Sequence, residues 1–190
     1  MDDLLAERNA LIAERDALEQ IERTGGTLTE AERQELRETR GAINARSRQL
    51  GETAAQDAME AEGRTRVYPR DEPVSTAGDF DSVYVGEENG QTIYYAVEEK
   101  GGSARLSRSG RLTEGGVRAE QGSSRYADSI IDAMMNSNNE ETREMGELLA
   151  EARQEGRVRY VMVRAPIGRS GGAPALRNIK ISELALSPVP

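Results

Sequence analysis

The sequence predicts an α/β protein in which helices flank a mixed sheet and an α-helical hairpin precedes it. Three observations predict this class. Leucine and isoleucine recur every seven residues over 2–62, which is typical of packed helices. Runs rich in β-branched and aromatic residues, separated by glycine-rich turns, lie at 81–100 and 157–184. Two further helical segments lie between these groups of strands, an order typical of layered α/β domains.

The first 62 residues are predicted to form the hairpin. The first helix covers 2–23, and "TGGT" ends it. Thr27 then suits an N-cap, with Glu30 three residues later completing a capping box. The second helix continues to about Glu62. Because a short glycine turn joins the two helices, we expect them to pack antiparallel.

A second domain, 63–190, is predicted to begin where the composition changes at Gly63. A loop-rich connection comes first, and "DSVYVGEENGQTIYYAVEEK" (81–100) then predicts a β-hairpin. Asn89-Gly90 supplies its turn residues. The Gly/Ser/Arg-rich segment 101–116 is predicted to be a loop.

The rest of the chain alternates helices and strands. Helices are predicted at 124–135 and 139–155, followed by a strand at 157–167. A loop at 168–174 and a last short strand at 176–184 complete the sheet.

The chain contains no Cys and no His, and this excludes several classes of site. Cys/His zinc sites, cysteine nucleophiles and Ser-His-Asp triads are impossible. Any catalysis must rest on carboxylates, Lys, Ser/Thr, Tyr and Arg, helped by a cation with oxygen ligands. No apolar run reaches the roughly 20 residues of a membrane span, and no signal peptide is recognised.

The formal charge of −9 is unevenly distributed. Residues 1–62 hold 15 acids and 8 bases, whereas 63–190 hold 19 acids and 17 bases. Within the second part, 100–125 has 6 bases against 2 acids, and 157–180 has 6 bases and no acid. The sequence is therefore compatible with a polyanionic substrate.

A candidate site lies at the end of the strand in "TIYYAVEEKGG" (92–102). Side chains alternate along a strand, so Glu98 and Lys100 share one face. Counting back from the turn places Asp81 at the same end of the hairpin. Two carboxylates on neighbouring strands suit Mg²⁺, and an adjacent lysine can orient or activate water and balance charge. The alternative is a strand end with solvated charges, and the spacing alone leaves both interpretations open.

The segment "GDFDSVYV…NGQTIYYAVEEKGGSARLSRSGRLTEGGVRAEQGSSRYADSIIDAMM" (78–135) resembles a known family. It is similar to the restriction-endonuclease-like toxin domains at the C-termini of bacterial polymorphic toxins, in the PD-(D/E)xK nuclease superfamily. The resemblance implies a restriction-endonuclease-like sheet. It also implies that Asp81 and Glu98 bind metal, with Glu52 as a further candidate ligand, and that Lys100 and Gln121 join the two acids as catalytic residues.

This resemblance implies a Mg²⁺-dependent (or Mn²⁺-dependent) deoxyribonuclease that acts as an antibacterial effector. Its expected partners are DNA, a cognate immunity protein and an upstream delivery module to which 1–62 would link it. It would be exported and would act in the target-cell cytoplasm. The sequence departs from the superfamily pattern in having Phe80 where the motif name has proline, and Glu99 where a small residue is expected.

Other interpretations stay open at this point. The fold also suits an RNase, or a non-catalytic adaptor built on a degenerate nuclease fold. Strand 157–164 is predicted to carry one basic face. Phosphate contacts are predicted for Arg105, Arg108, Arg111 and Arg118, which equally suit a solvated loop or an inhibitor epitope.

Overall fold

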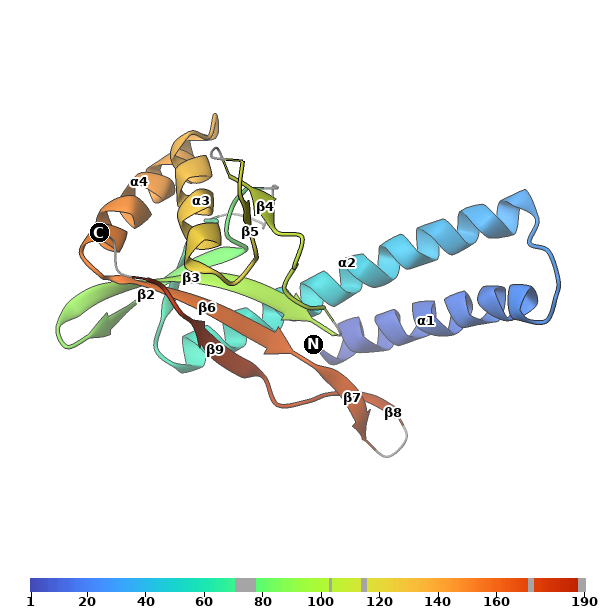
Figure 1. Ribbon diagram of the computed structural model, residues 1–190. Coiled ribbons are helices and arrows are strands. Elements are labelled where there is room, and N and C mark those ends of the chain that lie inside the picture. The colour runs from blue at the N-terminus through green and yellow to red at the C-terminus, as the bar shows by residue number, and fades with distance from the viewer. Residues whose placement is uncertain (71–77, 103, 114–115, 171–172, 188–190) are drawn as a thin grey trace.

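The computed structural model describes residues 1–70, 78–102, 104–113, 116–170 and 173–187. Its centre is a five-stranded mixed sheet with strand order β1-β2-β3-β6-β9 (Figure 1). β3 and β6 are parallel, and the other neighbours are antiparallel. The predicted α/β class is therefore confirmed. The strands are β1 Thr65–Tyr68, β2 Ser82–Glu88, β3 Gln91–Gly101, β6 Val158–Ala165 and β9 Lys180–Leu184.

Helices cover both faces of this sheet. The helices α3 (Ser124–Met135) and α4 (Glu140–Gln154) pack on one face, and α2 (Glu30–Ala61) packs on the other (Figure 1). Side chains of β3 point alternately into two hydrophobic cores, one on each face of the sheet. Ala96 packs in the core on the α3/α4 side, and Val97 packs in the core on the α2 side. Both faces of the strand are thus buried, in a three-layer arrangement.

The helix α1 (Asp2–Arg23) runs antiparallel to α2, as predicted. Ion pairs cross between them, with Glu7 bound to Arg46 at 2.6 Å and Glu19 bound to Arg40 at 2.9 Å. The far end of this hairpin extends away from the sheet (Figure 1) and has its own small core of Leu18, Leu28 and Leu36. In the described part of the chain, no helix has both the length and the apolar character required to cross a membrane.

The N-terminus of α2 differs from the prediction. The capping box uses Thr29 and Glu32, not Thr27 and Glu30. Both pairs have the required spacing. Leu28 explains why the later pair is used. Its side chain is buried in the hairpin core, so the backbone at residue 28 stays outside the helix and α2 begins after it.

The second half of α2 lies against the end of β3. A Cβ on Gly101 would overlap the carbonyl oxygen of Ser47, and a Cβ on Gly51 would lie 2.8 Å from the Gly101 nitrogen. Two glycines therefore allow helix and strand backbones to touch. The division of the chain at residue 62 stays a prediction, and the structure adds that this half of α2 belongs to the core of the sheet.

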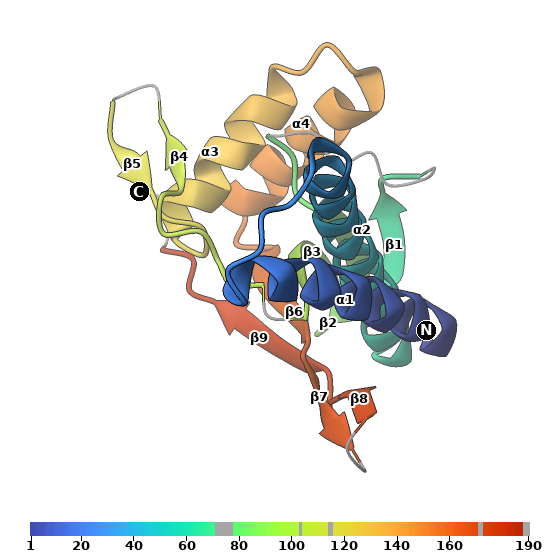
Figure 2. The same ribbon diagram turned by 90° about the vertical axis from the view of Figure 1, so that its right-hand side faces the viewer.

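Three segments predicted as loops contain short strands. The connection after residue 62 includes β1, although 71–77 lie outside the described residues. The predicted loops 101–116 and 168–174 supply strands to two small hairpins that project from the body (Figure 2). Strands of two to four residues show too little alternation to be recognised. These hairpins pair β4 Arg111–Leu112 with β5 Arg118–Ala119, and β7 Ile167–Ser170 with β8 Ala173–Leu176. The strand predicted at 176–184 is correspondingly divided between β8 and β9.

Candidate active site

The end of β3 brings Asp81, Glu98 and Lys100 together. The Nζ atom of Lys100 lies 2.9 Å from Oε2 of Glu98 and 3.4 Å from Oδ2 of Asp81. The ammonium group therefore contacts both carboxylates. The structure places these residues in one cluster, as the sequence predicts, and their catalytic roles stay predictions.

Asp81 fixes the geometry of the cluster. It directly precedes β2, and its Oδ2 accepts the backbone N–H of Glu99 at 2.8 Å. This bond ties the start of β2 to the end of β3. Because Asp81 is held by backbone as well as by Lys100, the two carboxylates keep a fixed separation.

Glu98 is almost fully buried, with 3% of its surface exposed. Its Oε1 accepts the Tyr160 hydroxyl at 3.0 Å, and its Oε2 accepts Lys100 and the Gln121 amide. The sequence analysis did not reveal the bond between Tyr160 and Glu98. The available signal was its position on a buried strand, because a buried tyrosine hydroxyl normally finds a partner.

Gln121 connects the cluster to the arginine-rich segment. Its Nε2 donates to Glu98, and its Oε1 accepts the backbone N–H of Ser107 at 2.9 Å. Its own backbone N–H donates to the Ser107 carbonyl at 3.1 Å. Gln121 thus positions both the buried carboxylate and the segment that precedes β4.

The acidic neighbours of Lys100 favour the charged form of its side chain. Burial alone lowers the pKa of Lys100, but Asp81 and Glu98 outweigh it, so that the pKa is raised. Burial raises the pKa of Glu98, and the Lys100 ammonium opposes that change. A lysine that stays protonated can neutralise developing negative charge and orient water. It is a poor proton acceptor.

Glu99 lies on the opposite face of β3, against α2. Its Oε1 accepts the Ser82 hydroxyl at 2.6 Å, and burial raises its pKa to about 8. The sequence analysis noted Glu99 only as a departure from the superfamily pattern, and the structure buries most of its side chain.

Glu52 of α2 lies near Glu99 rather than in the Lys100 cluster. Its carboxylate is close enough to raise the pKa of Glu99, and it pairs with Arg48 at 3.3 Å. Burial raises the pKa of Glu52 as well, and the charge of Asp81 adds to that shift. Within the described ranges, no group of three acidic residues is gathered to hold a metal ion. The structure therefore does not join Glu52 to Asp81 and Glu98 as a third ligand.

The predicted basic residues differ in their surroundings. Arg105, Arg108 and Arg118 are exposed, and Arg118 donates to the Ser109 carbonyl at 2.8 Å. Arg111 is partly buried and lines a cavity of about 350 Å³ together with Gln121.

The predicted basic face of strand 157–164 is not a free positive surface. Arg157 pairs with Glu155, and Arg159 lies 3.0 Å from Glu88 and 3.8 Å from Glu183. β6 also lies inside the sheet, between β3 and β9. Neighbouring acids therefore compensate Arg157 and Arg159, whereas Arg164 donates to the Ala104 carbonyl at 2.9 Å. Alternation along one strand does not reveal these partners.

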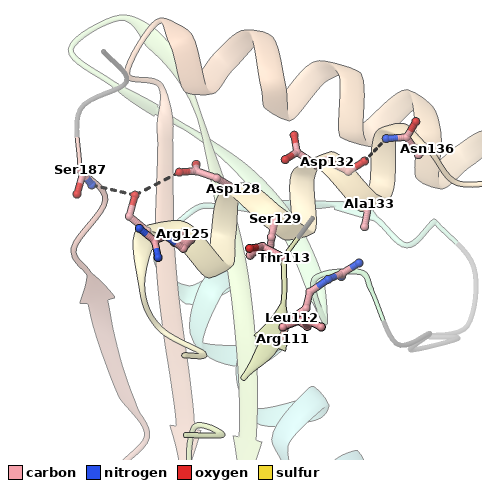
Figure 3. A pocket seen from close by; sticks show the side chains of 11 residues that line it. Arg111, Leu112, Thr113, Arg125, Asp128, Ser129, Asp132, Ala133, Asn136 and Ser187 are labelled. Atoms are coloured by element: carbon pink, nitrogen blue, oxygen red, sulfur yellow. Dashed lines mark hydrogen bonds between the residues drawn. The ribbon is translucent and has the colours of Figure 1, made fainter. Parts of the chain in front are cut away.

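A larger cavity, of about 790 Å³, lies along α3 and does not include the Lys100 cluster. Figure 3 shows Asp128 and Asp132 on α3, with Arg111 on the neighbouring β4 segment. Arg111 and Arg125 line this cavity together with Asp128 and Asp132, so its lining carries no net formal charge.

Comparisons of the chain with protein-family models, with curated proteins and with solved structures gave no match. The resemblance to restriction-endonuclease-like toxins therefore stays a prediction.

Proposed function

We propose that this protein is a metal-dependent nuclease that hydrolyses phosphodiester bonds of DNA. The observation that carries the proposal is the Lys100 ammonium, which contacts two carboxylates at the end of a rigid β-ribbon. Anionic ligands for a metal ion beside a fixed cation are one arrangement that can hydrolyse phosphodiesters without histidine. The resemblance of 78–135 to the PD-(D/E)xK toxins supports the same chemistry, and the mixed sheet between helices suits a restriction-endonuclease-like fold.

Asp81 and Glu98 would hold the metal ion. Their donor set fits Mg²⁺, because both supply hard carboxylate oxygens and the Asp81 side chain keeps 26% of its surface exposed for solvent and substrate. A bound Mg²⁺ would polarise the phosphate and lower the pKa of a coordinated water. Lys100 would balance charge at the phosphate, while Tyr160 and Gln121 would hold Glu98 in place.

Cleavage assays with Mg²⁺ and with EDTA test this proposal. Plasmid DNA and a structured RNA should be offered in parallel, since the fold also suits an RNase. Glu98→Ala and Lys100→Ala should each abolish cleavage. Glu87→Ala, which removes an exposed carboxylate from the same ribbon, should retain it. Full activity in either cluster variant would show that the site is elsewhere.

A non-catalytic adaptor is the second candidate. Both oxygens of Glu98 already accept hydrogen bonds from protein donors, and this observation favours the adaptor. A buried carboxylate bonded in this way can also serve a purely structural role. Absence of metal-dependent cleavage of either nucleic acid by the folded wild-type protein would favour this interpretation.

The antibacterial role rests on the resemblance. We expect the wild-type protein to be toxic in a bacterial cytoplasm and to be tolerated when a neighbouring gene supplies an immunity protein. The exposed arginines of 104–113 offer an acidic inhibitor a surface near the cluster. Lack of toxicity in cells that make an active nuclease, without any partner, would contradict the toxin role while leaving the nuclease intact.

A further inference from the structure

The 350 Å³ cavity beside Gln121, here called the Tyr126 pocket, adjoins the proposed catalytic cluster. Gln121 lines this pocket and also donates its amide to Glu98. A group bound in the pocket would thus lie one side chain away from the buried carboxylate. Its volume lies at the small end of the range typical of ligand sites.

Arg111 supplies the pocket with a positive charge. Its Nη1 lies 3.5 Å from the point that a Cβ on Gly78 would occupy, so the guanidinium lies against the bare backbone of Gly78. Within the described part of the chain, it has no hydrogen bond or ion pair. Since an arginine fork matches the oxygens of a phosphate, Arg111 is suited to bind one.

Tyr126 supplies an aromatic ring in a fixed position. It lies in the first turn of α3, where its backbone N–H donates to the Ser123 hydroxyl at 3.2 Å, and its ring packs on the edge of the core. Burial raises the pKa of its hydroxyl, and the charge of Glu98 raises it further, which agrees with a position beside the cluster. Aromatic rings that line a nucleic-acid site commonly stack on a base.

We propose that the Tyr126 pocket receives one unpaired nucleotide of the substrate, with the base on Tyr126 and a phosphate on Arg111. The adjacent phosphodiester would then lie at the Lys100 cluster. This deepens the proposed nuclease function and rests on it. It defines the substrate class as single-stranded or locally opened nucleic acid, because a base inside a duplex must leave its stack to enter such a pocket.

Binding of nucleic acid, measured without cleavage, tests the inference. The probe is a fluorescent single-stranded DNA of about 12 nucleotides, compared with the duplex of the same sequence, in EDTA at about 0.1 M salt, since salt strongly affects such affinities. Fluorescence anisotropy with the full-length wild-type chain gives both dissociation constants. We expect the single strand to bind at least about tenfold more tightly than the duplex.

Matched variants identify the pocket. Tyr126→Leu should weaken single-strand binding about 5- to 100-fold, as expected for the loss of one stacked base, whereas Tyr126→Phe should keep wild-type affinity. Arg111→Ala should weaken it about tenfold or more, with partial recovery in Arg111→Lys. Arg125→Ala is the control, since it removes the same charge from the residue next to Tyr126 but lies outside the pocket. Circular dichroism verifies that each variant is folded.

The outcomes separate this inference from the nuclease proposal. If Arg111→Ala and Arg125→Ala have equal effects, or if the duplex binds as tightly as the single strand, the pocket assignment is overturned even where the protein cleaves DNA. If the expected binding pattern appears but Mg²⁺ yields no cleavage, the pocket stands and the nuclease proposal fails. Failure to bind either probe would overturn the pocket assignment, and cleavage with Mg²⁺ would then decide the nuclease proposal separately.

Discussion

Gly101→Ala should destabilise the protein by forcing α2 away from the end of β3. The added Cβ would overlap the Ser47 carbonyl oxygen and would lie 3.0 Å from the Gly51 nitrogen. These are backbone atoms, which cannot rotate away, so the helix must move on the order of 1 Å. Overpacking of this kind usually costs about 1–3 kcal/mol. We expect a loss near the upper end, about 3 kcal/mol, in the free energy of unfolding.

Gly41→Ala provides a control on α2, the helix that the added Cβ at position 101 would displace. Its Cβ would meet no atom within 4 Å. Alanine in a helix interior is more favourable than glycine by roughly 0.5–1 kcal/mol, so this variant should be more stable than wild type. The same substitution is therefore expected to have opposite signs at two positions, and the difference isolates the contact between helix and strand.

Urea unfolding followed by circular dichroism measures both effects as shifts in midpoint at constant slope. Equal stability of Gly101→Ala and wild type, or a gain like that expected for Gly41→Ala, would refute the contact between α2 and β3. Because Gly101 directly follows Lys100, the proposed cleavage activity of Gly101→Ala should also fall when assayed well below its unfolding midpoint.

Three further outcomes are expected. Burial raises the pKa of Glu99 from 4.5 to about 8, so the folded state keeps a proton that the unfolded chain releases. In metal-free buffer the free energy of unfolding should therefore fall as pH rises from about 4.5 to 8, and Glu99→Gln should flatten this profile in urea titrations. Tyr160→Phe leaves buried Glu98 without one donor and should cost about 1.5–3 kcal/mol in thermal or urea unfolding, whereas an unchanged midpoint would contradict the hydrogen bond. Thr29→Ala should cost about 1 kcal/mol by loss of the cap, and Thr27→Ala should cost much less in the same measurement.

Local patterns in the sequence predict much of the site. Alternation along the strand places Glu98 and Lys100 on one face, and Asn89-Gly90 fixes the hairpin register that brings Asp81 to them. Both turn residues adopt positive φ, 51° for Asn89 and 75° for Gly90, as this kind of turn requires. These predictions succeed because they depend on residues close in sequence.

Contacts between distant segments could not be predicted in this way. Tyr160 reaches Glu98 because β6 pairs in parallel with β3, with Ala96 opposite Tyr160. No local pattern specifies that register. The approach of Gly51 to Gly101 likewise depends on how α2 crosses the sheet, since each glycine alone is also compatible with a turn or a flexible segment.

The end of β3 carries three consecutive ionisable side chains. The surroundings of these side chains differ between the two faces of the strand. On the α3 side, the Lys100 ammonium contacts both Glu98 and Asp81 and so compensates part of their negative charge. On the α2 side, Glu99 accepts the Ser82 hydroxyl, and its pKa, raised mainly by burial, favours the neutral acid. The backbone contact between Gly101 and α2 also closes that side to a substrate. In the proposed nuclease, a polyanionic substrate would therefore approach the Lys100 cluster from the side of α3, where Gln121 and the Tyr126 pocket lie.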